Sequence, residues 1–385
     1  MPDFIKNFIA DAERENRKRT LRSIIPLSPA ECILDGKKVL NFSSNDYLGL
    51  SWHPLLKEEA LKWMDKYGSG STASRLVCGT NPAIVELEEK IAEWKKSEAA
   101  LIFGSGYLAN AGIISALANR ETIIFADKLN HSSLNSGCLL SGAKFRRYRH
   151  NDIKALKDML DSSDASTGKL IVSDTVFSMD GDIAPIEEIY NAARDNNTLL
   201  FLDDAHATGV FGENGEGLAH ADAGTVVMGT FSKAMGSYGA YAACSKELKE
   251  YLVNRCSTFI YSTALPPSVC GSISAALKLV RSSEFAAIRT ELKNKSDFLR
   301  EELKNIGYDT GAGSTQIIPL IINDTERTLR LSDFLLKKGI LAIAIRPPTV
   351  PENSSRIRIS LNASHSHDNI SFLLKALADA KKELL

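Results

Sequence analysis

A single lysine follows a short apolar run beyond the middle of the chain. The run from Thr225 to Met228 predicts a buried strand, and Lys233 comes shortly after it in Thr-Phe-Ser-Lys-Ala-Met-Gly. A lysine just past the end of a buried strand can reach a ligand at the carboxyl edge of a sheet. Because partial burial lowers the pKa of an amine and frees its lone pair, Lys233 is a candidate for a Schiff base with an aldehyde. The alternative is an ordinary lysine in a surface loop.

A second apolar run, which begins at Leu199, ends in Asp203-Asp-Ala-His206. Asp203 closes the run and would be partly buried, and a buried aspartate needs a cationic or hydrogen-bond-donating partner. The protonated pyridine nitrogen of pyridoxal 5'-phosphate (PLP) is such a partner, because the protonated ring accepts electrons from a carbanion. His206 could then hydrogen-bond the ring hydroxyl. The alternative is a strand end with two solvated carboxylates and a capping histidine. The placement of Asp203 and Lys233 after successive strands favours PLP.

Further stretches of suitable chemistry follow other predicted strands. Gly104-Ser-Gly-Tyr107 joins a strand to a helix, and a glycine-rich turn at a helix start can bind a phosphate. His131 follows another strand and could stack on a planar ring, although a histidine that starts a helix is an equally good interpretation. Ser178 follows a third strand. Because ligands of open α/β sheets bind at the carboxyl ends of the strands, these stretches together predict a binding site at that edge.

Composition narrows the class of protein. The 385 residues are 44% hydrophobic and 24% charged with a net charge of −1, which suits a globular enzyme and gives no sign of a nucleic-acid or anionic membrane partner. Six scattered cysteines without a C-x-x-C pair favour reduced thiols in a cytoplasmic protein. The N-terminal residues resemble neither a signal peptide nor a membrane span. The two histidines of His365-Ser-His367 lack other nearby ligands, so no metal site is predicted.

Strands and helices alternate through most of the chain, which predicts an α/β fold with a mostly parallel sheet. After about residue 305 the pattern changes to that of a compact α+β domain. We therefore expect an N-terminal arm over 1–44, a large ligand-binding domain over 45–285 and a small C-terminal domain over 286–385. We also expect a helix over 1–24 and one continuous strand over 340–345.

Arginines occur in or beside the predicted strands of the small domain. Arg346 precedes two prolines, and Arg356 and Arg358 alternate with isoleucine, so the last two share one face of a strand. A guanidinium on a sheet face near a cleft would suit a carboxylate, which it can hold through two parallel hydrogen bonds. The alternative is a pair of surface arginines.

Together these motifs resemble the α-oxoamine synthases, PLP enzymes of the aspartate-aminotransferase-like fold (fold type I), along nearly the whole chain. The matching stretches are Asn41–Leu50 (NFSSNDYLGL), Val176–Asp182 (VFSMDGD), Asp203–Gly212 (DDAHATGVFG), Thr230–Gly236 (TFSKAMG) and Tyr261–Pro267 (YSTALPP). This family joins an amino acid to an acyl thioester with loss of CO2. Within it, Ala344–Pro351 (AIRPPTVP) is most similar to the members that use L-alanine and pimeloyl-CoA, or pimeloyl-acyl carrier protein, in biotin synthesis.

The resemblance implies a catalytic set and a cofactor-binding set. Lys233 would bind PLP covalently and move protons at the substrate Cα, Asp203 would pair with the pyridine nitrogen, His206 would bond the ring hydroxyl and His131 would stack on the ring. The implied cofactor contacts are Lys233, Gly106, Tyr107, His131, Ser178, Asp203, His206, Thr230, Ser262 and Thr263. The last two would reach the phosphate of the neighbouring subunit's cofactor, which implies a homodimer with shared active sites.

The resemblance also implies a set of substrate contacts. Asn45 and Arg358 would hold the substrate carboxylate, and Arg19 and Arg346 would bind negative groups of the acyl chain or of CoA. The full implied substrate-binding set is Arg19, Asn45, Arg346, Thr349 and Arg358.

Two positions depart from the common family pattern, and other functions remain open. Residues 71–75 replace a glycine-richer loop, which leaves the environment of the acyl chain open, and Ser232 stands where glycine is common. Alternative substrate pairs are glycine with acetyl-CoA, as in 2-amino-3-oxobutyrate CoA ligase, and serine with a long-chain acyl-CoA. A non-catalytic partner subunit of a larger synthase would be expected to lack the Schiff-base lysine, whereas this chain contains Lys233. A protein that binds a nucleotide at the Gly104 turn would be expected to carry a G-x-G-x-x-G or P-loop motif there, and neither motif occurs at that turn.

Overall fold

The computed structural model describes residues 2–164 and 166–384. These residues form two compact units, of which the larger contains residues 50–178 and 183–289. The smaller unit contains residues 2–49, 179–182 and 290–384, so both ends of the chain contribute to it. The three domain ranges expected from the sequence stay predictions.

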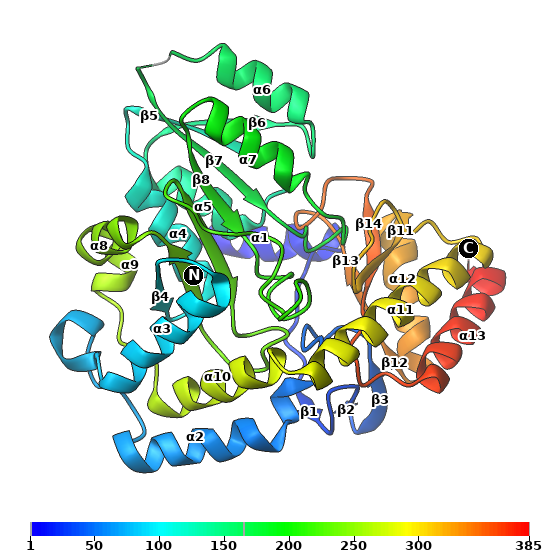
Figure 1. Ribbon diagram of the computed structural model, residues 1–385. Helices are drawn as coiled ribbons and strands as arrows, with labels where there is room; N and C mark the ends of the chain where they lie inside the picture. The colour runs from blue at the N-terminus through cyan, green and yellow to red at the C-terminus, as the bar shows by residue number, and fades with distance from the viewer. Residues whose placement is uncertain (1, 165, 385) are drawn as a thin grey trace. The chain divides into compact units, whose positions relative to one another are not determined.

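The larger unit is built on a seven-stranded sheet in the order β4-β10-β9-β8-β7-β5-β6. Figure 1 labels β4, β5, β6, β7 and β8 of this sheet. Neighbouring strands are parallel except at β10, which is antiparallel to both β4 and β9. This confirms the predicted mostly parallel sheet and the α/β fold class. The strands are β4 (Ala99–Phe103), β5 (Thr122–Asp127), β6 (Lys144–Tyr148), β7 (Gly168–Asp174), β8 (Leu199–Asp203), β9 (Thr225–Thr230) and β10 (Ala240–Cys244).

Both faces of this sheet are buried, which explains why its strands are apolar throughout. In β5, Ile124 and Ala126 belong to one apolar core, whereas Ile123 and Phe125 belong to the core on the other face. The first core includes Leu134 of α5 (Ser132–Leu140), and the second includes residues of α6 (Ile153–Asp161) and α7 (Ile186–Asp195). Because side chains alternate along a strand, an unbroken apolar run supplies two cores at once.

Helices join the strands of the larger unit and cover its sheet. Two of them begin at caps that the sequence signals clearly: Asn81 accepts a hydrogen bond from the Ile84 amide, and Ser105 accepts one from the Leu108 amide. The helices are α2 (Pro54–Tyr67), α3 (Pro82–Lys95), α4 (Gly106–Leu117), α5 (Ser132–Leu140), α6 (Ile153–Asp161), α7 (Ile186–Asp195), α8 (Lys246–Arg255), α9 (Ser257–Ile260) and α10 (Pro267–Val280). The long helix α11 (Ser283–Asn305) continues from this unit into the smaller one.

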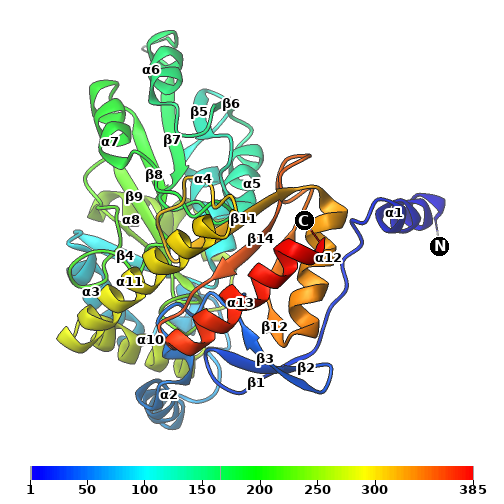
Figure 2. The same cartoon turned by 90° about the vertical axis from the view of Figure 1, so that its right-hand side faces the viewer.

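The smaller unit contains two sheets, in the orders β1-β2-β3-β12 and β11-β14-β13. In the first sheet, β12 is parallel to β3, whereas all pairs of the second are antiparallel. Helices α12 and α13 lie side by side in this unit (Figure 2). Its elements are α1 (Asp3–Arg14), β1 (Ile24–Pro26), β2 (Glu31–Leu34), β3 (Lys37–Asn41), β11 (Ile317–Asn323), α12 (Thr325–Lys337), β12 (Ile340–Leu341), β13 (Ile343–Ile345), β14 (Ser355–Ser360) and α13 (His367–Leu384).

Two elements differ from the expectation. The helix expected over residues 1–24 ends at Arg14, because Asn16 takes a left-handed conformation (φ 56°) that a helix cannot continue through, and residues 24–26 form a strand instead. The strand expected over residues 340–345 is divided at Ala342, since β12 pairs with β3 and β13 pairs with β14 of the other sheet. Across residues 2–164 and 166–384, every helix is too short or too polar to cross a membrane.

Candidate active site

A cavity of about 240 Å³ opens at the carboxyl ends of the strands in the larger unit. Strands β7, β8 and β9 end at its wall in Asp174, Asp203 and Thr230, and Lys233 follows from the loop after β9. The fold therefore brings together most of the cofactor-binding residues expected from the sequence. Those that line the cavity are Gly106, Tyr107, His131, Asp203, His206, Thr230 and Lys233.

One end of the cavity is suited to an anion. Gly106 and Tyr107 are the first residues of α4, where backbone N–H groups have no partner within the helix and the helix dipole is positive. Thr230 closes the same wall, with its hydroxyl 2.7 Å from that of Ser232. A phosphate group placed here would be bound by backbone amides and hydroxyls.

Asp203 lies at the buried side of the cavity, with 5% of its surface exposed. Its Oδ1 accepts a hydrogen bond from the Ala205 amide at 2.9 Å, and its Oδ2 accepts one from Asn110 Nδ2 at 2.7 Å. Two donors hold the carboxylate in one orientation, so it can also accept from a cationic N–H of a ligand.

His131 is held at the cavity wall by its backbone and by its ring. Its amide donates to Asp174 Oδ2 at 2.7 Å, and its ring Nδ1 lies 2.7 Å from Ser133 Oγ and accepts from the Ser133 amide at 3.3 Å. Partial desolvation lowers the pKa of His131, the Asp203 carboxylate opposes this, and Lys233 lowers it further. The lowered pKa favours the neutral imidazole, although the His131 residue as a whole is exposed to solvent.

Asp174 and Asp203 are paired in register across β7 and β8 and line the same cavity. Desolvation, and next the charge of Asp203, raise the pKa of Asp174 well above its usual range. Asp174 thus keeps its proton to a higher pH than an ordinary aspartic acid, which is the usual result of burying an acid beside another carboxylate.

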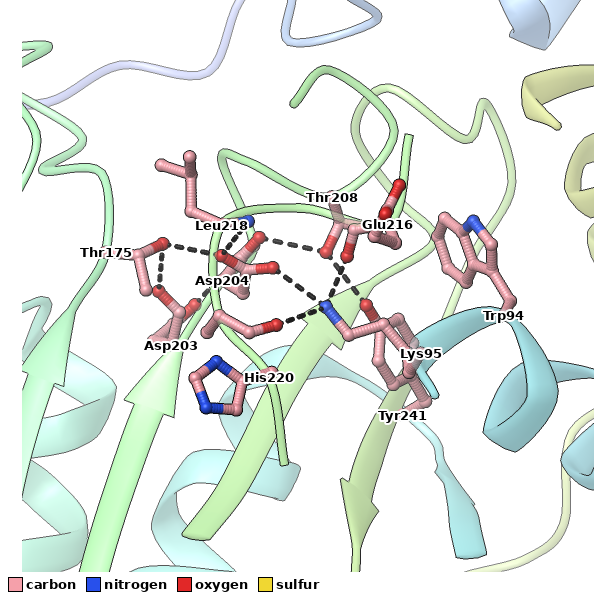
Figure 3. Close-up of polar contacts among 12 residues, drawn as sticks. Trp94, Lys95, Thr175, Asp203, Asp204, Thr208, Glu216, Leu218, His220 and Tyr241 are labelled. Carbon is pink, nitrogen blue, oxygen red and sulfur yellow. Dashed lines mark hydrogen bonds and ion pairs between the residues drawn. The ribbon is translucent and has the colours of Figure 1, made fainter. Parts of the chain in front are cut away.

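Asp204, the residue after Asp203, places its carboxylate in a second, buried cluster of polar groups (Figure 3). Lys95 Nζ lies 3.1 Å from Asp204 Oδ2 and donates to the carbonyls of Glu216 and Ala219. Asp204 Oδ1 accepts from the Thr175 hydroxyl at 2.8 Å and from the Leu218 amide. The ion pair is fully buried, so each charge relies on the other and on these polar neighbours.

The pKa values within this cluster follow from the competition between burial and charge. Burial acts to lower the pKa of Lys95, but the phenol of Tyr241 and the carboxylate of Asp204 outweigh it and raise that pKa. Burial raises the pKa of Asp204 despite the opposing effect of Lys95. Lys95 is charged, because its ammonium group donates to three acceptors, namely Asp204 Oδ2 and the carbonyls of Glu216 and Ala219.

Three of the expected cofactor residues lie elsewhere in the larger unit. Ser178 is not among the residues that line the 240 Å³ cavity. Ser262 and Thr263 line a separate small cavity with Arg75 and Phe259. Their expected contacts with PLP stay predictions, and those of Ser262 and Thr263 concern the cofactor of a neighbouring subunit.

In the smaller unit, Asn45 and Arg358 are in contact. Arg358 is buried, and one of its Nη atoms donates to Asn45 Oδ1 at 3.0 Å and to Ser360 Oγ at 2.6 Å. Arg356 is buried as well and forms an ion pair with Asp180. The alternative of two surface arginines is therefore wrong.

A cavity of about 600 Å³ in the same unit is lined by Arg19, Arg346 and Thr349. Arg19 donates to Thr349 Oγ1 at 3.1 Å, and Arg346 donates to the carbonyls of Asn16 at 2.6 Å and Lys18 at 2.7 Å. Desolvation, and next the like charge of Arg19, lower the pKa of Arg346. An anion bound in this cavity would offset that repulsion.

Asn110, Ser133 and Asp174 also line the 240 Å³ cavity, although they lie outside the set expected from the sequence. Asn110 is one of the few polar residues in a mostly apolar helix, one turn after Gly106, and that spacing places it on the same face. Asp174 ends a strand at the edge already expected to bind a ligand. The contact of Ser133 with Asn110 depends on how α4 and α5 pack, which local sequence does not specify.

Comparison with known proteins identifies relatives along nearly the whole chain. The aminotransferase class I and II family matches residues 37–377. A putative 8-amino-7-oxononanoate synthase of Paramagnetospirillum magneticum is 47% identical over 99% of this chain and 98% of its own. The 8-amino-7-oxononanoate synthase of Trichlorobacter lovleyi is 46% identical over 95% of this chain and 94% of its own.

Solved structures share the fold. Serine palmitoyltransferase of Sphingomonas wittichii superimposes with a TM-score of 0.92 at 30% identity, covering 99% of this chain and 97% of its own. A structure described as SPT with a PLP internal aldimine gives a TM-score of 0.93 at 27% identity and covers 99% of this chain and 98% of its own. The 8-amino-7-oxononanoate synthase of Francisella tularensis gives 0.77 at 28% identity over 90% of this chain and 98% of its own.

Proposed function

The chain belongs to the aminotransferase class I and II family, and we propose that it condenses L-alanine with a pimeloyl thioester to give 8-amino-7-oxononanoate, CO2 and a free thiol. This is the step that would place it in biotin biosynthesis, with the pimeloyl group on CoA or on acyl carrier protein. The observation that carries the reaction class is the cavity that gathers Lys233, Asp203, His131 and the start of α4. The curated relatives support the choice of substrates, because they are named for this product.

The protein is a PLP-dependent acyltransferase, and its cavity fits the cofactor. The start of α4 suits the phosphate, and the doubly held Asp203 carboxylate suits a protonated pyridine nitrogen. Asn110 supports this fit, since it lines the same cavity and its Nδ2 donates to Asp203 at 2.7 Å. When bound, PLP supplies an electron-accepting ring that stabilises negative charge at the amino acid Cα.

Each residue then has a defined task. Lys233 Nζ removes the proton from the alanine Cα, and this carbon forms a bond to the thioester carbonyl carbon as the C–S bond breaks. The proton held by Lys233 passes to the thiolate, which leaves as the free thiol. Loss of CO2 then leaves an electron pair on the same carbon, and Lys233, reprotonated from solvent, donates a proton to it. Asp203 would keep the pyridine nitrogen of bound PLP protonated, and His206 would hydrogen-bond its ring hydroxyl. His131 would stack on the ring and donate a hydrogen bond to the new ketone oxygen.

The remaining residues bind the substrates. Arg358, oriented by Asn45, holds the carboxylate of the amino acid through a charge-assisted hydrogen bond. Arg19, Arg346 and Thr349 bind negative groups of the acyl donor in the 600 Å³ cavity. Ser262 and Thr263 reach the phosphate in the neighbouring subunit of a homodimer.

Thiol release tests the substrate assignment directly. Purified protein is offered L-alanine, glycine or serine, each with pimeloyl-CoA, acetyl-CoA or palmitoyl-CoA. Alanine with pimeloyl-CoA is the expected preferred pair. Preference for serine and palmitoyl-CoA would replace the proposal with the reaction of the structural relative, serine palmitoyltransferase, and preference for glycine and acetyl-CoA would also overturn it.

The Lys233→Ala variant tests the catalytic assignment. It is expected to lose turnover and the visible absorbance band of bound PLP at about 420 nm. Tyr238→Ala, an exposed residue shortly after Lys233 and outside the cavity, is the matched control and should keep both. A Lys233→Ala enzyme that turns over at the wild-type rate contradicts the proposal.

A further inference from the structure

We propose that Asn110 and Ser133 form a hydrogen-bonded bridge that links the Asp203 carboxylate to the His131 imidazole and holds the neutral imidazole in the tautomer protonated at Nε2. The inference rests on the proposed function, in which Asp203 and His131 contact the cofactor. Asn110 and Ser133 are positioning residues in this account, because they act through Asp203 and His131.

The orientation of the Asn110 amide is set by its neighbours. Its Nδ2 lies 2.7 Å from Asp203 Oδ2 and 2.8 Å from Ser133 Oγ. A carboxylate can only accept hydrogen bonds, so the amide group facing Asp203 is the NH2 and not the carbonyl oxygen. The two hydrogens of that NH2 are thus shared between Asp203 and Ser133, and both Asn110 and Ser133 are 1% exposed.

The hydroxyl of Ser133 carries the bridge to His131. Because Ser133 Oγ accepts from Asn110, its hydrogen remains available for His131 Nδ1 at 2.7 Å. The Ser133 amide, which can only donate, also points at Nδ1 at 3.3 Å. A ring nitrogen facing two donors must be the acceptor, so the hydrogen of the neutral imidazole is on Nε2.

The backbone around the bridge is rigid. Asp174 accepts from the His131 amide at 2.7 Å, which holds the start of α5. Helices α4 and α5 also approach closely at Gly137, where an added Cβ would lie 2.9 Å from the Asn110 carbonyl oxygen and 2.9 Å from Ile114 Cβ. The close approach places Asn110 of α4 against Ser133 of α5.

The bridge gives the two cofactor-facing groups complementary hydrogen-bonding roles. Asn110 donates to Asp203, whose carboxylate is an acceptor and suits a protonated pyridine nitrogen. Ser133 donates to His131 Nδ1 and leaves Nε2–H as the ring's donor, which suits a ketone oxygen of the product. Without the bridge, His131 could exchange tautomers and Asp203 would lose one of its two donors.

The bridge can be tested on the PLP-loaded enzyme with two readouts that do not depend on turnover. The first is the 15N spectrum of histidine-labelled protein, in which the His131 signals are assigned by their loss in His131→Ala. The second is the pH titration of the visible absorbance of bound PLP. The variants are Asn110→Ala, Ser133→Ala and the double variant, and the control is Ser115→Ala, a serine on α4 whose hydroxyl bonds the Gly112 carbonyl.

We expect the Nε2–H tautomer in the wild type and a mixture of tautomers in both single variants. The absorbance titration should shift in the same direction in each, with about a tenfold loss of PLP affinity in Asn110→Ala, as for one lost charge-assisted hydrogen bond. The loss of PLP binding free energy in the double variant should be smaller than the sum of the losses in the two single variants, because the two residues act in one chain of hydrogen bonds. Ser115→Ala should behave like the wild type.

An Nδ1–H tautomer in the wild type overturns the inference, as does an unchanged tautomer in both single variants or strictly additive effects. If Asn110→Ala does not fold, the tautomer of His131 in Ser133→Ala alone tests the inference. That variant removes a single hydroxyl and keeps the backbone at the start of α5. The proposed function fails separately, through a Lys233→Ala enzyme that still turns over. An active enzyme with unaltered Asn110→Ala spectra would overturn the bridge alone.

Discussion

Asp203 and Asp204 are consecutive residues whose carboxylates belong to two different clusters. Asp203 accepts from Asn110 at the wall of the cavity, whereas Asp204 accepts from Lys95 in a fully buried ion pair (Figure 3). The Asp204 amide also donates to the Met228 carbonyl of the neighbouring strand at 2.7 Å. The contacts that anchor Asp204 thus also hold Asp203, the residue that would face the cofactor.

Loss of the Lys95 charge should destabilise the fold strongly. Lys95→Met would leave the Asp204 carboxylate buried without its cation, a change that typically costs about 3–5 kcal/mol of unfolding free energy. Lys96→Met is the matched control, because the next lysine is exposed and only weakly paired, with an expected effect within about 0.5 kcal/mol. Urea unfolding followed by circular dichroism measures both. Equal losses in the two variants would show that Lys95 is not an anchor.

Asp174 should make stability depend on pH. Its raised pKa means that the folded protein keeps this proton where the unfolded chain, with a pKa of about 3.9, has lost it. Between those two pKa values the folded state binds more protons, so this contribution to stability is complete at lower pH and is lost as pH rises. Asp174→Asn should remove that loss, which is at most about 1.4 kcal/mol per pH unit for one proton.

The measurement is urea unfolding at a series of pH values with PLP held at a saturating concentration. The stability of the wild type minus that of Asp174→Asn should fall as pH rises above about 4. Asp195→Asn changes an exposed aspartate and should show no such trend. A wild-type advantage that grows with pH has the opposite sign and would contradict a protonated Asp174.

Arg346 should affect the acyl donor and not the amino acid. Arg346→Ala removes a charge from the 600 Å³ cavity, so we expect the KM for pimeloyl-CoA to rise about tenfold, as for one charge-assisted hydrogen bond, while the KM for alanine and kcat change little. Arg330→Ala, an exposed arginine on α12, is the control. Steady-state thiol release measures all three constants. A larger effect on the KM for alanine would assign Arg346 to the other substrate.

Shared active sites would allow two defective subunits to complement each other. Lys233→Ala lacks the catalytic lysine, and the Ser262→Ala/Thr263→Ala variant lacks the groups that we expect to reach the neighbouring subunit's PLP. In a hybrid dimer one site contains both sets intact, so statistical mixing should restore about a quarter of wild-type activity. The assay uses a PLP concentration too low to load the double variant alone. Activity equal to the average of the two parents would contradict sharing.

The sequence predicts the larger unit well because its signals are local. Each parallel strand is an apolar run whose alternate residues fill two cores, as Ile123 and Ile124 do, and such a run is visible without the fold. Lys233 and His131 follow strands and Asp203 ends one, and strand ends meet at one edge. Recognition of these residues therefore requires only the strand pattern and the chemistry of the side chains.

The remaining features depend on contacts between distant segments. The bridge of Asn110 and Ser133 exists because α4 and α5 approach at Gly137, and nothing near Asn110 in the sequence signals that approach. The division of residues 340–345 into β12 and β13 depends on β3 and β14, which pair with one part each. The Lys95 pair likewise joins α3 to the turn after β8.

The pairing of β3 with β12 sets a constraint on biosynthesis. β3 is synthesised before the whole of the larger unit, whereas its parallel partner β12 is synthesised after it. The smaller unit is therefore begun before the larger unit and completed after it, against the usual order in which domains fold as they emerge. A translation product that stops after Arg289 and before Ile340 would expose the β3 edge, and such edges recruit other chains. Truncated products should accordingly aggregate even though they contain the whole of the larger unit.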